Sequence, residues 1–107
     1  MREYVELGPA EELGNGEVRG YQAQGTDVAV ARVDGELLAF VDVCTHRHCT
    51  LSPGEVDGDT IECECHGSVF SMRTGEVVNP PATEPISTYP VREHEGRIEV
   101  DLSGEGS

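Results

Sequence analysis

Short runs in which apolar and polar residues alternate recur along this chain, and turn residues separate them. The clearest pair, residues 27–33 and 36–41, flanks Asp34-Gly35, a dipeptide that favours a two-residue type I′ turn. We therefore expect an antiparallel hairpin whose second strand leads the chain to Cys44. The same pattern predicts further short strands at residues 4–7, 60–62, 76–78, 86–93 and 97–102, the last two joined as a hairpin. Residues 18–21 alternate only loosely, and turn residues on both sides of 55–56 indicate a small hairpin-like excursion before 60–62.

Glycine and proline set the boundaries of these strands. The chain has 13 Gly and 6 Pro in 107 residues, which favours turns and short strands over long helices. We expect Gly8-Pro9 to interrupt regular structure after the first strand. We also expect residues 79–82 to form an irregular loop, because two consecutive prolines donate no ladder hydrogen bonds. The predicted class is all-β, with residues 1–107 forming one domain.

The net charge of the chain limits the classes of partner that it is expected to bind. With 21 acidic and 7 basic residues the formal net charge is −14, which disfavours binding to nucleic acid or to an anionic membrane surface. This charge favours basic protein partners, although an acidic surface can equally serve to keep a small protein dispersed. The first residues lack the apolar region of a signal peptide, and no stretch approaches the roughly 20 apolar residues of a membrane span. We therefore expect a cytoplasmic protein that binds neither nucleic acid nor membrane.

Two short motifs hold the candidate metal ligands. The sequence C-T-H at residues 44–46 is followed, after 16 intervening residues, by C-E-C-H at residues 63–66. Each motif offers one thiolate and one imidazole, so two loops could bind two adjacent metal ions, one through both sulfurs and the other through both nitrogens. A zinc site is the alternative. Zinc ligands usually come as C-x2–4-C and H-x3–5-H pairs, however, and the spacing found here fits that pattern poorly.

The pattern C-x-H, sixteen residues, C-x-x-H, with Gly67 directly after the second histidine, resembles the Rieske [2Fe–2S] family. The resemblance implies an antiparallel β-sandwich of two packed sheets into which a small cluster-binding lobe, residues 44–79, is inserted. It also implies one [2Fe–2S] cluster per chain, with the ligands Cys44, His46, Cys63 and His66. With two thiolates the oxidised site is formally neutral, so we expect a potential in the Rieske range of about −150 to +300 mV.

Two residue pairs match family positions that hold or cover the cluster. Cys49 and Cys65 match the cysteines that form a loop-joining disulfide in quinol-oxidising Rieske proteins. The alternative is a reduced, buried pair, which a cytosolic compartment would favour. Pro80 and Pro81 resemble the family's third loop, which covers the cluster on the side away from the ligand loops, and a rigid surface turn is the alternative.

Two further residues match positions that tune the potential. Ser68 matches a serine whose hydroxyl bonds a bridging sulfide, with an ordinary turn serine as the alternative. Phe70 stands where high-potential members carry a tyrosine that donates to a ligand sulfur. Ser68, Cys49 and Cys65 are features of high-potential members, whereas Phe70 is a low-potential feature, so we expect an intermediate value within the Rieske range.

The chain offers no nucleophile–base pair and no substrate-binding motif, so we expect an electron-transfer component and not an enzyme. The resemblance implies a monomeric ferredoxin that passes electrons from a flavoprotein reductase to the terminal component of a ring-hydroxylating dioxygenase or similar oxygenase. Both partners are expected to dock transiently near His46 and His66. Two alternatives stay open: a small Rieske subunit of a larger nitrite- or arsenite-handling oxidoreductase, and a non-redox, metal-stabilised interaction domain.

Overall fold

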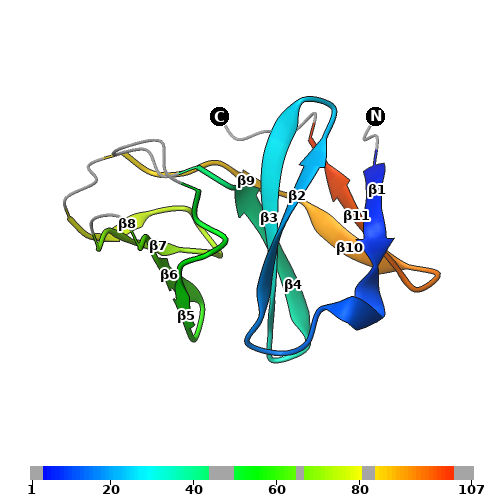
Figure 1. Ribbon diagram of the computed structural model, residues 1–107, viewed down its shortest axis with the longest axis horizontal. Helices are drawn as coiled ribbons and strands as arrows, with labels where there is room; N and C mark the ends of the chain where they lie inside the picture. Colours follow the sequence, from blue (N-terminus) through cyan, green and yellow to red (C-terminus); the bar gives the residue numbers. More distant parts are fainter. Residues whose placement is uncertain (1–3, 44–49, 65–66, 81–83, 103–107) are drawn as a thin grey trace.

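The computed structural model describes residues 4–43, 50–64, 67–80 and 84–102 of the chain. Short strands dominate these residues, and a single turn of 3-10 helix is present (Figure 1). The elements are β1 (Tyr4–Pro9), η1 (Ala10–Glu12), β2 (Val18–Ala23), β3 (Thr26–Val33), β4 (Glu36–Val41), β5 (Glu55–Asp57), β6 (Thr60–Glu62), β7 (Val69–Ser71), β8 (Val77–Asn79), β9 (Thr88–Tyr89), β10 (Val91–His94) and β11 (Arg97–Asp101).

The strands form three antiparallel sheets, with the orders β1-β11-β10, β2-β3-β4-β9 and β5-β6-β7-β8. In Figure 1 the sheet of β5 to β8 forms a lobe on the left, while the other two sheets pack together on the right. The predicted antiparallel β-sandwich with an inserted lobe is therefore confirmed. Both ends of the lobe connect to the four-stranded sheet of the sandwich, through β4 on one side and β9 on the other.

The hairpin predicted at Asp34-Gly35 forms as expected. β3 and β4 pair up to Val33 opposite Glu36, and both turn residues have positive φ, 51° for Asp34 and 82° for Gly35, as a type I′ turn requires. β10 and β11 pair in the same way across a second two-residue turn. These local signals fix the register of the two hairpins.

The structure corrects three details of the expected strands. β1 continues through Gly8-Pro9, with a register shift between Glu6 and Gly8, because it is an edge strand and Pro9 has no inner ladder bond to donate. Asn79 belongs to β8 and not to the following loop. The single strand expected over residues 86–93 is two strands, since Pro90 separates β9 in one sheet from β10 in the other.

The four-stranded sheet of the sandwich is the middle layer, and β3 is buried on both faces. Val28 and Val30 face the core that lies against the β1-β11-β10 sheet, together with Ile98 and Val100. The alternate residues of β3 face the lobe. They belong to a second core cluster that consists of Ala29, Ala31, Val33, Leu38, Phe40, Leu51, Ile61, Cys63, Phe70, Met72 and Ile86.

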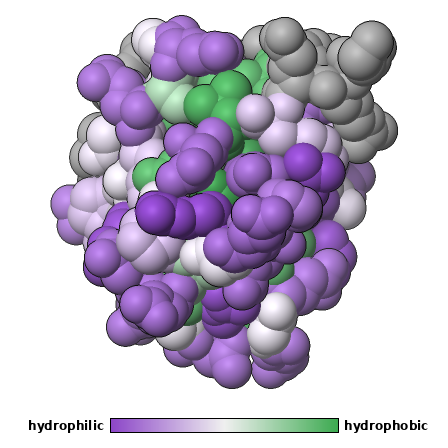
Figure 2. Space-filling model, turned by 90° about the vertical axis from the view of Figure 1, so that its right-hand side faces the viewer, coloured by the Kyte–Doolittle hydropathy of each residue, from purple (hydrophilic) through white to green (hydrophobic). Residues whose placement is uncertain are grey.

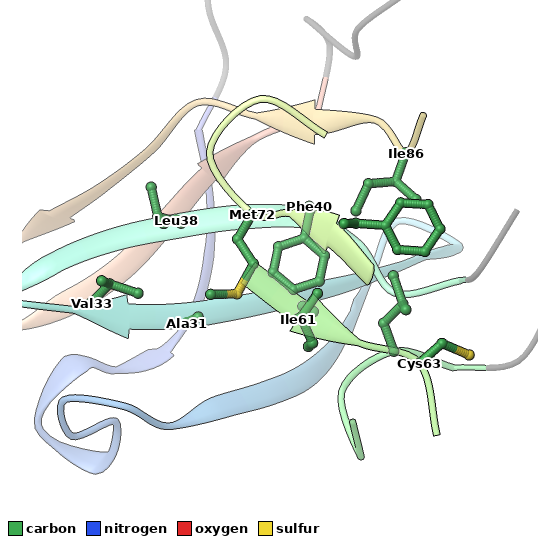
Figure 3. Packing of buried hydrophobic residues seen from close by; sticks show 11 residues of the cluster. Ala31, Val33, Leu38, Phe40, Ile61, Cys63, Met72 and Ile86 are labelled. Carbon is green, nitrogen blue, oxygen red and sulfur yellow. The ribbon is translucent and has the colours of Figure 1, made fainter. Parts of the chain in front are cut away.

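This second cluster, which we call the lobe core, runs from the middle sheet into the lobe. Figure 3 shows Val33 and Leu38 toward one end of the view and Cys63 and Ile86 toward the other, with Phe40 and Ile61 between them. A shared apolar core of this kind fixes the lobe against the sandwich, because separating them would expose fully buried side chains. The orientation of Cys63 is therefore determined by the packing of both parts.

The surface away from the lobe is mostly hydrophilic. Figure 2 views the molecule from the side of the β1-β11-β10 sheet, where hydrophilic side chains cover most of the face. Among the described residues, Val78 is the large apolar side chain left exposed. The described residues also contain no helix that is long and apolar enough to cross a bilayer.

Candidate metal centre

The described residues on either side of positions 65 and 66 form the two sides of a turn between β6 and β7. The Cys63 amide donates to the Ser68 carbonyl at 2.7 Å, and the Gly67 amide donates to the Cys63 carbonyl at 2.9 Å. Gly67 has φ +79°, a conformation that suits glycine. These bonds close the turn and place Cys63 next to the fully buried Ser68.

Asp42 lies at the base of the first candidate loop, directly after β4 (Glu36–Val41) and two residues before Cys44. One carboxylate oxygen of Asp42, Oδ1, accepts hydrogen bonds from the amides of Leu51 at 2.8 Å and Ser52 at 2.6 Å. The other oxygen, Oδ2, accepts a bond from the Ser52 hydroxyl at 2.8 Å. Asp42 is therefore joined directly to Leu51 and Ser52, the described residues that follow the first candidate motif.

The bases of the two loops lie side by side. The backbone at Gly54 approaches that of Glu62 so closely that a Cβ atom on Gly54 would lie 2.0 Å from the Glu62 carbonyl oxygen. Gly54 is also bonded to the first loop base, since its amide donates to the Leu51 carbonyl at 2.8 Å. A surface hollow of about 480 Å³ lies at this junction, lined by Pro53, Gly54, Glu55, Glu62, Cys63, Glu64 and Gly67.

The structure describes four of the residues singled out in the sequence. Cys63, Ser68 and Phe70 are buried close together in or beside the lobe core, whereas Pro80 is exposed. The remaining candidates lie outside the described residues: Cys44, His46, Cys49, Cys65, His66 and Pro81. Their assignments, including the Cys49–Cys65 disulfide, stay predictions.

The donor set and its surroundings suit a Rieske-type cluster. Within the described ranges no group of three or more His, Cys, Asp or Glu side chains is placed to hold a metal ion, as expected when three of the four candidate ligands lie outside those ranges. Cys63 sits with 1% exposure at the end of an apolar core. A site of two thiolates and two neutral imidazoles leaves an oxidised cluster formally neutral, and a neutral group is much less costly to bury than the doubly negative alternative.

An exposed ion-pair network adds a polar link between lobe and sandwich. Arg73, just after β7, donates to both carboxylate oxygens of Glu36 at 2.9 and 3.0 Å and lies 3.4 Å from Asp59. The hydrogen bond with Glu36, followed by its charge, raises the pKa of Arg73 above its already high ordinary value. Because Glu36 begins β4 and Arg73 belongs to the lobe, this contact orients the two parts in addition to their shared core.

Sequence reasoning missed Asp42 and Ser52. In the sequence both look like ordinary polar residues next to turns. The residues that bond to Asp42 are Leu51, nine positions later, and Ser52, ten positions later, so no local pattern reveals the contact. The available signal was an aspartate placed between a buried strand and a ligand motif, since buried carboxylates in such places need donors.

Comparisons with known proteins agree with this geometry. The family description "Rieske [2Fe-2S] domain" matches residues 3–90. The anthranilate 1,2-dioxygenase ferredoxin subunit of Burkholderia cepacia is 35% identical over 102 residues, covering 95% of this chain and 94% of that protein. The biphenyl dioxygenase ferredoxin subunit of Pseudomonas sp. (strain KKS102) is 40% identical over 94 residues, covering 87% and 86% respectively.

Two solved structures share the fold along nearly the whole chain. The Sphingomonas yanoikuyae B1 ferredoxin has a TM-score of 0.87 at 35% identity, covering 94% of this chain and 99% of that one. A chain in the complex of reduced oxygenase and oxidized ferredoxin of carbazole 1,9a-dioxygenase has a TM-score of 0.88 at 33% identity, covering 94% of both chains.

Proposed function

The chain belongs to the Rieske [2Fe–2S] family, and from this we propose that it is a ferredoxin, a one-electron carrier between a flavoprotein reductase and a terminal oxygenase. Relatives that match it along most of its length are ferredoxin subunits of dioxygenase systems, and one structural neighbour is a complex of an oxygenase with its ferredoxin. The observation that carries the proposal is the adjacency of the two ligand-loop bases at the buried Cys63. The described segments that flank these two motifs are distant in the sequence but lie side by side at Gly54 and Glu62.

We assign Cys44 and Cys63 as the protein ligands of one iron, and His46 and His66 as the protein ligands of the other. When bound, the [2Fe–2S] group accepts one electron from a donor and releases it to an acceptor. The chain supplies a fixed setting for that exchange. Cys63 is held by the backbone bonds of its turn, and the lobe core excludes water from its side of the site. We propose that the hydroxyl of Ser68, a residue fully buried next to Cys63, bonds a sulfide of the cluster.

We propose that docking is transient and in part electrostatic. Glu55, Glu62 and Glu64 line the hollow beside Cys63, so the described surface nearest the site is acidic. A basic partner surface would be attracted to it, with an association rate that falls as salt increases. Among the described residues Val78 is the large apolar side chain left exposed, which favours a monomeric carrier over a permanently bound subunit that would need an apolar interface. We place this exchange in the cytoplasm, where such a reductase would meet the carrier.

Spectroscopy with matched histidine variants tests the ligand assignment. The reduced wild-type protein should give the electron paramagnetic resonance and absorbance signals of a cluster with two imidazole ligands, and its potential should fall within about −150 to +300 mV. His46→Ala and His66→Ala should lose these signals. His94→Ala is the control because His94 is exposed at the end of β10 and should leave them unchanged. Loss of the signal in the control, or its survival in both ligand variants, contradicts the assignment.

Reconstitution tests the carrier function separately. Electron transfer from a flavoprotein reductase through this protein to an aromatic-ring oxygenase should require the cluster and should slow at high salt. Gel filtration with each partner should show complexes that dissociate as salt is raised. A complex that survives high salt would instead indicate a fixed subunit, and a protein without a reducible cluster would indicate a non-redox module.

A further inference from the structure

A buried carboxylate closes the loop that carries the first two candidate ligands, and the proposed function gives it no role. Asp42 is 5% exposed and accepts three hydrogen bonds, two from the amides of Leu51 and Ser52 and one from the Ser52 hydroxyl. Its own amide donates to the Asp27 carbonyl at 2.9 Å, which fixes its backbone to the start of β3. All three donors to the carboxylate come from the chain segment directly after the loop.

A glycine on the neighbouring strand leaves room for this arrangement. Gly20, in β2, packs against the carboxylate so closely that a Cβ atom there would lie 2.7 Å from Asp42 Oδ2 and 2.9 Å from the Ser52 hydroxyl oxygen. Both separations are shorter than real Cβ contacts allow. Three segments far apart in sequence thus meet at one polar point inside the molecule.

The energetics of burial explain why such a point holds a loop in place. A buried carboxylate is strongly unfavourable unless donors surround it, so the loop ends cannot separate without leaving that charge unpaired. Charge-assisted hydrogen bonds are also stronger than neutral ones. Joining Asp42 to Leu51 and Ser52 lowers the conformational entropy of a chain segment that connects them.

We propose that Asp42, Ser52 and Gly20 form a latch that positions the loop bearing Cys44 and His46, with Asp42 acting as a positioning residue for the cluster. The latch rests on the proposed function only in its assignment of those two ligands. Asp42 also lies two residues from Cys44, at most about 7 Å along the chain. Its negative charge therefore opposes the addition of an electron to the site.

The test compares Asp42→Ala with Asp42→Asn in the full-length, cluster-loaded protein. In D42A all three bonds are lost. In D42N the amide oxygen can still accept from the Leu51 and Ser52 amides, and the amide nitrogen can donate to the Ser52 hydroxyl, so only the charge is removed. Ser52→Ala removes the hydroxyl that donates to Asp42, and Gly20→Ala places a methyl group against the carboxylate. Ile98→Val, in the core cluster on the far side of the middle sheet, is the control for general stability.

Three measurements separate positioning from general stability: hydrogen exchange at the Leu51 and Ser52 amides, the g values of the reduced cluster, and the rate of cluster loss to a chelator. D42A should speed exchange at both amides by about tenfold or more, as expected for loss of a charge-assisted hydrogen bond. It should also shift the g values and accelerate cluster loss. D42N keeps neutral hydrogen bonds at the same places, so it should restore most of the exchange protection and bring the g values close to those of the wild type, while moving the potential in the positive direction. I98V should leave exchange, g values and cluster loss unchanged.

The proposal is overturned if D42A keeps wild-type exchange and g values, or if I98V changes them as much as D42A does. It is also overturned if D42N fails to restore them. If D42A does not fold, S52A and G20A still decide the matter, because each must speed exchange at residues 51–52 more than I98V does. A wild-type protein without a Rieske spectrum would defeat the proposed function alone, since the exchange measurements would still report on the latch.

Discussion

Phe70→Tyr adds a single hydroxyl group at the position that the sequence resemblance matches to a tyrosine of high-potential Rieske proteins. Phe70 lies in β7 with no exposed surface, opposite Ile61 on β6 and in the same core cluster as Cys63. The substitution keeps the ring and its packing, so its effect should come from the hydroxyl. If the hydroxyl reaches a ligand sulfur, it should stabilise the reduced site and raise the potential.

Because Phe70 is fully buried, we can estimate both the cost of a hydroxyl that finds no partner and the gain from one that bonds a ligand sulfur. A hydroxyl that finds no partner in this fully buried place should cost about 1–3 kcal/mol of folding free energy. A hydrogen bond to a charged acceptor contributes about 1.5–3 kcal/mol, and if about 1 kcal/mol of it is gained only on reduction, the potential rises by about 40 mV. We therefore expect F70Y to combine a positive shift of this size with little loss of stability.

Redox titration followed by electron paramagnetic resonance measures the first quantity, and denaturant unfolding of the same samples measures the second. Phe70→Leu is the control, because it alters the packing of the core but adds no donor. A shift in F70Y of less than about 10 mV, or roughly 0.2 kcal/mol, would refute the reasoning. A comparable positive shift in F70L would also refute it, since packing alone would then explain the change.

Three other substitutions test separate parts of the structure. Ser68→Ala removes a fully buried hydroxyl beside Cys63 and should lower the potential by tens of millivolts, about 59 mV for each 1.4 kcal/mol of differential stabilisation, in the same titration. Gly75→Ala should destabilise the fold by more than about 1 kcal/mol in denaturant melts, because Gly75 has φ +84° and a Cβ atom there would clash with the Ile86 carbonyl oxygen. Gly58→Ala is the control and should cost less stability, because Gly58 also has a positive φ, +62°, but has open space around it. Burial raises the pKa of Tyr21 above its ordinary value of 10.0, so the unfolded state ionises first and stability falls as the pH rises beyond that value. Tyr21→Phe should reduce this alkaline loss of stability, measured as the unfolding midpoint at pH 8 and above pH 10.

The elements that local sequence controls were predicted well. The turn at Asp34-Gly35 requires two positive φ angles, and this dipeptide supplies residues that tolerate them, so the hairpin and its register follow from the sequence alone. The strand leading to Cys63 was likewise readable from its β-branched residues and flanking turns. Prediction was less successful at prolines. Pro9 is accommodated because β1 is an edge strand, and Pro90 marks a change of sheet, and neither context is visible in the sequence.

The candidate site divides in the same way. The identity and spacing of the Cys and His residues are covalent facts of the chain, and the chemistry of thiolates and imidazoles limits what they can bind, so sequence alone indicated the cluster and the family. Only the tertiary structure decided how the two loop bases are held together. Asp42 meets Ser52 and Gly20, and Gly54 meets Glu62, through contacts between segments that are distant in the chain. A carboxylate's burial and its donors depend on the packing of three strands and loops at once, and no local pattern of residues specifies that packing.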